Sequence, residues 1–290
     1  MCPMCLAASG AYVASGVSAG AVTTFLAAKL LRKRAEPTDR PRPIEQEKTM
    51  PTPTIVSRDE WTAARRRLLA QEKEFNRQRD ALSAERRRLP MVEIAKEYVF
   101  QAPEARRTLA DLFEGRRQLL VYHFMFDPAW DEGCPSCSFV ADNFAGALVH
   151  LAARDTAFAV VSRAPIAAIE RFKKRMGWSF PWLSSFGSEF NHDFQVTLDQ
   201  NHAEYNYAPV SAQGAGYPRE GEREGLSVFL RDGARLYHTY STYQRGIDML
   251  LNTYNLLDLT PLGRQEEDGI MRWVRHHDRY SEGASHGLAR

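Results

Sequence analysis

Residues 119–137 read LLVYHFMFDPAWDEGCPSC and decide the fold. The first part of this stretch is an apolar run, which is typical of a buried strand. A short turn with Pro128 and Gly133 follows, and after the cysteines the apolar residues of 139–151 recur at helical spacing. The pattern therefore predicts a strand that leads directly into a helix, with Cys134 near the N-terminus of that helix.

The spacing of Cys134 and Cys137 predicts thiol–disulfide chemistry. Unpaired backbone N–H groups and the positive end of the helix dipole stabilise a thiolate at the start of a helix. Pro135 suits the first helical position because its missing N–H costs nothing there. We expect Cys134 to be the attacking thiol and Cys137, one turn further on, to be the resolving thiol. An inert reduced pair and half of a zinc site are the alternatives.

The composition sets further limits. The 290 residues carry a net charge of +2, which gives no reason to expect a nucleic-acid partner. The four cysteines form two C-x-x-C pairs, Cys2/Cys5 and Cys134/Cys137, and they are too few for a disulfide scaffold. One zinc ion held by both pairs would close a loop far longer than zinc ribbons use. We expect no cofactor and no resident metal.

The N-terminus has the pattern of a membrane anchor. Residues 6–28 carry no charge and are long enough to span a bilayer as a helix. A basic cluster at 29–34 follows, so the positive-inside rule places the N-terminus outside and the remaining chain in the cytoplasm. The alternatives are a weakly apolar helix that packs on the domain, or a true start at Met50.

The chain divides into four parts. Residues 1–35 form the apolar helix, and 36–56 form a linker rich in proline, threonine and charge. Residues 57–90 predict a long charged helix opened by a capping box, and 91–290 form the main domain. We expect the long helix to pack on the main domain through a narrow stripe of residues spaced by seven: Trp61, Leu68, Phe75, Leu82 and Leu89.

The main domain alternates strands and helices. After the dithiol helix, the sequence predicts a strand at 157–161, a helix from Pro165 to Gly177 and a short strand at 194–198. Two further strands flank Asp232-Gly233, a strong hairpin signal. A last helix is expected over residues 243–257. This order predicts an α/β domain, a mixed sheet with helices on both faces, and it resembles the thioredoxin fold.

The local sequence is closer still to one bacterial family. It resembles thioredoxin-like proteins described as predicted dithiol–disulfide oxidoreductases and classed as a domain of unknown function, and the resemblance spans about 55–280. This resemblance implies an oxidoreductase in which Cys134 and Cys137 are catalytic. The matching stretches are Tyr122–Phe126, Gly133–Phe139, Leu148–Asp155, Arg171–Trp178, Tyr254–Asp258 and Trp273–Tyr280.

Two features bear on the substrate. Thioredoxins carry a proline before the hairpin strand that binds substrate backbone, whereas Glu224-Gly225-Leu226 stands in that place here. The resemblance therefore does not imply recognition of unfolded proteins. The stretch Phe180–Ser184 looks like the corresponding segment of peroxiredoxins, which implies small peroxides as substrates. The partner is thus an unidentified thiol, disulfide or peroxide. The polar insertion 201–223 is either a lid or surface decoration.

Several side chains are candidate partners of the dithiol. Trp130 resembles the tryptophan that precedes a thioredoxin-type dithiol and shields the thiolate from water. His123 lies in the strand before the dithiol and is expected to be structural. His276 and His277 fall in an irregular tail that we expect to be exposed, although a protonated histidine near Cys134 would lower the pKa of that thiol.

The alternative to an enzyme is a thioredoxin-like carrier of copper or zinc. In that hypothesis Cys134, Cys137 and a histidine would bind the metal.

Overall fold

The computed structural model describes residues 53–213 and 218–280. The predicted helix over 6–28, the Cys2/Cys5 pair and the linker up to residue 52 lie outside the described residues. Within the described ranges, no helix is long and apolar enough to cross a membrane. The anchor and the cytoplasmic location therefore stay predictions.

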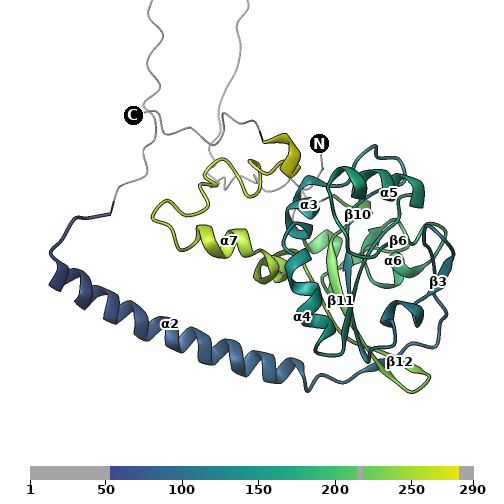
Figure 1. The fold of residues 1–290 in the computed structure, drawn as a ribbon, viewed down its shortest axis with the longest axis horizontal. Coiled ribbons are helices and arrows are strands. Elements are labelled where there is room, and N and C mark those ends of the chain that lie inside the picture. Colours follow the sequence, from purple (N-terminus) through teal and green to yellow (C-terminus); the bar gives the residue numbers. More distant parts are fainter. Residues whose placement is uncertain (1–52, 214–217, 281–290) are drawn as a thin grey trace, which may run out of the picture.

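An eight-stranded mixed sheet forms the centre of the domain (Figure 1). Its three parallel strands, β4, β5 and β6, are neighbours, and every other adjacent pair is antiparallel. Across the sheet the order is β1 (Val92–Glu93), β12 (Arg235–Tyr243), β11 (Gly225–Asp232), β4 (Gln118–His123), β5 (Thr156–Ser162), β6 (Trp182–Ser184), β2 (Val99–Gln101) and β3 (Arg106–Thr108).

The connections after β4 follow the predicted order with shorter helices. The predicted 139–151 helix is divided, because a 3-10 turn interrupts it, and the first half of the predicted last helix is a 3-10 helix as well. The helices are α3 (Pro135–Ala141), α4 (Leu148–Ala152), α5 (Ile166–Arg175), α6 (Phe190–Asp193) and α7 (Asn252–Leu257), with 3-10 helices at Asp111–Phe113, Ala145–Ala147, Val210–Ala212, Gln244–Leu250 and His277–Arg279.

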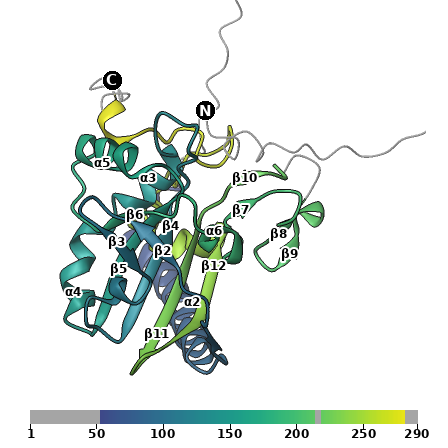
Figure 2. The same cartoon turned by 90° about the vertical axis from the view of Figure 1, so that its right-hand side faces the viewer.

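The insertion between α6 and β11 forms two small sheets beside the main one (Figure 2). One pairs β7 (Thr197–Leu198) with β10 (Gly221–Glu222), and the other pairs β8 (Glu204–Tyr205) with β9 (Ala208–Pro209). Side chains of this insertion form a separate buried cluster with Tyr243 of β12. Its described residues therefore pack beside the sheet as a local unit.

The strand order explains where the helices lie. The chain passes from β4 to β5 to β6 in one direction across the sheet, and parallel crossovers are right-handed. Two crossovers in the same direction place their helices on the same face, and α3 and α5 accordingly contribute to one buried cluster together with α7. The opposite face has a second buried cluster. Among the described helices, α6 and the 3-10 helix Asp111–Phe113 contribute residues to it. The predicted α/β sheet is thus present, with its helices unequally shared between the faces.

The long helix α2 (Arg58–Arg86) differs from the prediction. Its capping box is formed, since Glu60 N–H donates to Ser57 Oγ at 3.3 Å and Ser57 N–H donates to Glu60 Oε2 at 3.0 Å. No residue of α2 is buried, and Phe75 in the middle of the apolar stripe is 64% exposed. The predicted packing of this stripe on the main domain is therefore not found, and Figure 1 shows α2 extending away from the sheet.

Candidate active site

The turn before α3 holds Cys134 at the start of the helix. Cys134 N–H donates to Met125 O at 3.0 Å, and Ser138 donates to Cys134 O from both its N–H and its hydroxyl at 2.9 Å. A Cβ on Gly133 would lie 2.6 Å from the Phe124 ring and 2.7 Å from the Phe172 ring. Only glycine fits this close approach, so the residue before the dithiol is fixed by packing. Pro135 occupies the first turn as predicted.

Both cysteines are present as thiols and each is only 2% exposed. Cys137 accepts a hydrogen bond at its Sγ from Met125 N–H at 3.4 Å. The backbone of Met125 therefore contacts both cysteines: its carbonyl accepts from Cys134 N–H, and its N–H donates to Cys137 Sγ. The two belong to the cluster that fills the α3 face of the sheet.

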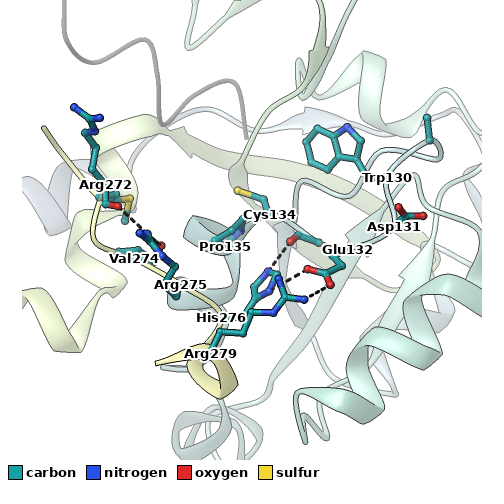
Figure 3. Close-up of a pocket in the computed structure, with 13 residues that line it drawn as sticks. Trp130, Asp131, Glu132, Cys134, Pro135, Arg272, Val274, Arg275, His276 and Arg279 are labelled. Carbon is teal, nitrogen blue, oxygen red and sulfur yellow. Dashed lines mark hydrogen bonds and ion pairs between the residues drawn. The ribbon is translucent and has the colours of Figure 1, made fainter. Parts of the chain in front are cut away.

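A pocket of about 830 Å³ opens beside Cys134 (Figure 3). One side is the loop 129–135, which includes Trp130 and Pro135, and the other side is the C-terminal segment 271–279. Cys134 lines this pocket, whereas Cys137 is not among its lining residues. The described residues of the insertion 201–223 do not line it either, so the segment over the dithiol is 271–279.

His276 is buried in the wall of this pocket and is 3% exposed. Its Nε2 lies 2.9 Å from Gly133 O, and its Nδ1 lies 3.1 Å from a guanidinium nitrogen of Arg175. A carbonyl only accepts and a guanidinium only donates, so these two hydrogen bonds assign the hydrogen to Nε2 and the acceptor role to Nδ1, which also lies 3.4 Å from the Glu132 carboxylate. Burial lowers the pKa of His276 below its usual value, in agreement with a neutral ring. The prediction that the tail is exposed is therefore wrong for His276.

Ion pairs fasten the C-terminal segment to the pocket loop. The Glu132 carboxylate lies 3.0 Å from Arg175 and also contacts Arg279 and His276. Arg175 in turn pairs with Asp278 at 2.7 Å. In Figure 3, Glu132 lies between the loop and the segment that carries His276 and Arg279. This network joins residues about 140 positions apart in the sequence, which is why local patterns did not predict it.

His277 points elsewhere. Its Nδ1 lies 2.7 Å from Asp142 Oδ1, which also accepts the indole N–H of Trp178 at 2.8 Å. It does not line the pocket, so only one of the two tail histidines reaches the site.

His123 lies on the opposite face of the sheet from the dithiol. Its Nε2 is 2.8 Å from Ser227 Oγ, and its ring stacks near Phe190 and Phe194. Burial lowers its pKa to about 3, with a smaller contribution from His238. His123 is therefore a buried neutral residue of the far face, which agrees with the structural role predicted for it.

Tyr122 is the residue that the sequence analysis missed. It is fully buried in the same cluster as both cysteines. Its phenol has a pKa raised well above the usual value, first by burial and then by the neighbouring Cys137 thiol and by Glu224. Burial also raises the pKa of Glu224, the first residue of the stretch Glu224-Gly225-Leu226. The sequence contained a signal for the position of Tyr122. Successive residues of a strand face opposite sides of the sheet, so Tyr122 and its neighbour His123 cannot share a face.

The topology and the site define a thioredoxin-like α/β protein with a C-x-x-C dithiol at the start of the helix after its central strand. Within that class, residues 50–280 match the model of a family described as a bacterial protein of unknown function, DUF899. The match covers most of the chain, and the protein belongs to this family.

Solved structures with partial similarity include three bacterial proteins. A PrxQ mutant of Xylella fastidiosa is 13% identical, with 58% of this chain and 94% of that chain covered and a TM-score of 0.38. Peroxiredoxin Q of Xanthomonas campestris is 14% identical, with 57% and 95% covered and a TM-score of 0.40. Peroxidoxin BcpB of Mycobacterium tuberculosis is 14% identical, with 58% and 97% covered and a TM-score of 0.39. No curated protein matches the chain.

Proposed function

We propose that the protein is a thiol–disulfide oxidoreductase in which Cys134 attacks and Cys137 resolves. One observation carries this proposal: Cys134 lines a pocket of about 830 Å³, while Cys137 lies one helical turn further on and away from that pocket. A substrate in the pocket meets only the first thiol. The second thiol is placed to react with whatever forms on the first.

The chemistry balances with two electrons. With a disulfide substrate, the Cys134 thiolate forms a mixed disulfide and releases one substrate thiol; Cys137 then displaces the second thiol and forms the Cys134–Cys137 disulfide. With a peroxide, Cys134 takes the terminal oxygen as a sulfenic acid and releases an alcohol or water, and Cys137 condenses with it and releases water. An external thiol reductant restores both thiols.

The pocket favours small substrates. Its two walls, the loop 129–135 and the segment 271–279, are held together by the Glu132 ion pairs. A folded protein disulfide would have to displace this network, whereas a small peroxide or a low-molecular-weight disulfide would not. We therefore place thiol peroxidase activity first among the possible reactions.

His276 acts in this proposal as a positioning residue. Its hydrogen bond to Gly133 O holds the backbone of the residue before Cys134. The pKa of His276 is lowered by burial, so a charged imidazolium is not the group that would stabilise the thiolate. Trp130 lines the same pocket and limits the access of water to Cys134.

The test is to treat the reduced protein with hydrogen peroxide, an alkyl hydroperoxide and glutathione disulfide, and to map the products by mass spectrometry. We expect a Cys134–Cys137 disulfide with at least one oxidant. In Cys137→Ser, the reaction should stop at a sulfenic acid or mixed disulfide on Cys134. First modification at Cys137, or no reaction with any oxidant, would contradict the proposal.

The metal-carrier alternative is weakened by one observation. Both ring nitrogens of His276 are already engaged, one by Gly133 O and the other by Arg175. The histidine that lines the pocket is thus not available as a third ligand in this arrangement. Metal content of the purified protein, measured with and without a reductant, separates the two hypotheses.

A further inference from the structure

A second cluster of chemically active side chains lies where α6 meets the turn between β7 and β8, beside the main sheet. His192 belongs to α6, and Asp199 and His202 lie in the turn that follows β7. None of the three lines the pocket beside Cys134. The ligand atoms of these residues, one from each, all lie within 4.8 Å of one another.

The cluster is built by its own turn. Asp199 Oδ1 accepts from Asn201 N–H at 2.8 Å and from His202 N–H at 2.9 Å, and it lies 2.9 Å from His202 Nδ1. The other carboxylate oxygen, Oδ2, lies 3.7 Å from His192 Nδ1. The imidazole rings of His192 and His202 are 4.4 Å apart between their centroids. The turn thus fixes Asp199 and His202, and α6 brings His192 to them.

One nitrogen in this cluster lacks a partner. His192 Nδ1 is buried and makes no hydrogen bond with any of the described residues. Buried polar atoms in native proteins are almost always satisfied, so such an atom needs an explanation. Asp199 Oδ2 faces it at 3.7 Å, which is too long for a hydrogen bond. A bound cation between these two atoms would give the buried nitrogen a partner.

We propose that His192, Asp199 and His202 form a three-ligand site for a divalent transition-metal ion of the zinc class. Two imidazole nitrogens and one carboxylate oxygen suit zinc, cobalt or nickel, whereas magnesium and calcium prefer oxygen ligands. Ligand atoms at about 2.0–2.2 Å from zinc in a tetrahedral site lie roughly 3.3–3.6 Å apart, close to the 3.7 Å between His192 Nδ1 and Asp199 Oδ2.

The surroundings suit an open site. The side chains of Asp199 and His202 are 43% and 37% exposed, so water can complete the coordination. The bound ion would join α6 to the turn between β7 and β8 and would tie the insertion together near its base.

The experiment is a titration of Zn²⁺ into the full chain with all four cysteines replaced by serine, followed by calorimetry. Removal of the thiols makes the result independent of the dithiol and of the proposed function. We expect one Zn²⁺ per chain, and each of His192→Gln, Asp199→Asn and His202→Gln should weaken binding by at least about tenfold. His150→Gln, a change of an exposed histidine on α4, should leave binding unchanged.

A second measurement keeps the proposal testable if a variant does not fold. In the serine background, Zn²⁺ should shift the ring signals of two histidines in NMR spectra, and excess Mg²⁺ should not displace the ion. Absence of binding, unchanged binding in the folded His192→Gln and His202→Gln variants, or displacement by Mg²⁺ would overturn the site.

Discussion

Tyr122 and His123 are neighbours in β4, both are buried, and they face opposite sides of the sheet. Tyr122 shares its face with Cys134 and Cys137, and the pocket opens on that side. His123 shares its face with Phe190 and Phe194. Two adjacent aromatic residues therefore belong to two different environments, and the pocket beside the Cys134 thiol opens on the Tyr122 side.

Three hydrogen bonds link the polar side chains of the far face, while His123 Nδ1 is buried and makes no hydrogen bond with any of the described residues. His123 bonds to Ser227 at 2.8 Å, Ser227 bonds to Ser241 at 2.8 Å, and Ser241 bonds to His238 at 2.7 Å. Burial lowers the pKa of both histidines in this chain of hydrogen bonds. We infer that the His123 face contributes stability and the Tyr122 face contributes chemistry.

The largest effect should follow Cys134→Ser. Among the described residues, Cys134 alone supplies a thiol to the pocket lining, so its loss should remove the attacking group, and we expect the rate of reaction with oxidant to fall on the order of 10³-fold or more. Cys137→Ser is the matched control, because it keeps the first step and loses only disulfide formation. Stopped-flow measurement of single-turnover thiol loss separates the two. Equal first-step rates in the two variants would show that the pocket does not select Cys134.

The next effect should come from Gly133→Ala. A Cβ there would meet Phe124 and Phe172 at less than 3 Å, so the turn before Cys134 must shift. We expect a loss of about 1–3 kcal/mol in the free energy of unfolding and slower thiol reaction. Gly146→Ala is the control, since nothing lies within 4 Å of its Cβ position. Denaturant unfolding of both variants provides the measurement, and equal losses would show that packing at Gly133 does not hold the turn.

These tests depend on contacts that were partly predictable. Strand β4, the dithiol helix and the β11–β12 hairpin were found because their signals are local: an apolar run, Pro135 after Cys134, and Asp232-Gly233. The wall of the pocket was missed. His276 reaches Gly133 across 143 positions, and no local pattern encodes such a contact.

For the long helix α2, the sequence predicted a packing of the apolar stripe on the main domain that the structure does not have. Its capping box and heptad spacing predicted α2 correctly, since a helix start and its periodicity are local. The same spacing did not reveal what covers the stripe, and Trp61 at 51% exposed shows that the sheet does not. Periodicity identifies an apolar face but contains no information on its partner.

On the far face, His123→Gln should change the pH dependence of stability. The pKa of His123 falls from 6.5 to about 3 on folding, so the unfolded chain binds the extra proton between these values. The contribution of His123 to the free energy of unfolding is fully present above pH 6.5. It falls by about 2 kcal/mol for each 1.5 pH units as the pH decreases from 6.5 towards 3. The variant should flatten this slope, whereas His150→Gln should not. The measurement is denaturant unfolding of the variant at several pH values together with its rate of thiol reaction. A flattened slope with an unchanged rate would support the division of faces, whereas a slower thiol reaction would contradict it.

The smallest effect should come from His276→Gln, and it distinguishes two roles for this histidine. If His276 positions Gly133 through a neutral N–H, loss of one hydrogen bond of about 0.5–1.5 kcal/mol should slow thiol reaction roughly twofold to tenfold. The pH profile of that reaction should keep its shape, because burial lowers the pKa of His276 and leaves no charge to remove near neutral pH. If instead an imidazolium stabilised the Cys134 thiolate, the substitution would raise the apparent pKa of Cys134. Rates of alkylation at Cys134 across the pH range 5 to 9 decide between them. An upward shift of the midpoint would restore the hypothesis of a charged histidine, whereas a uniformly lower rate would establish His276 as a positioning residue.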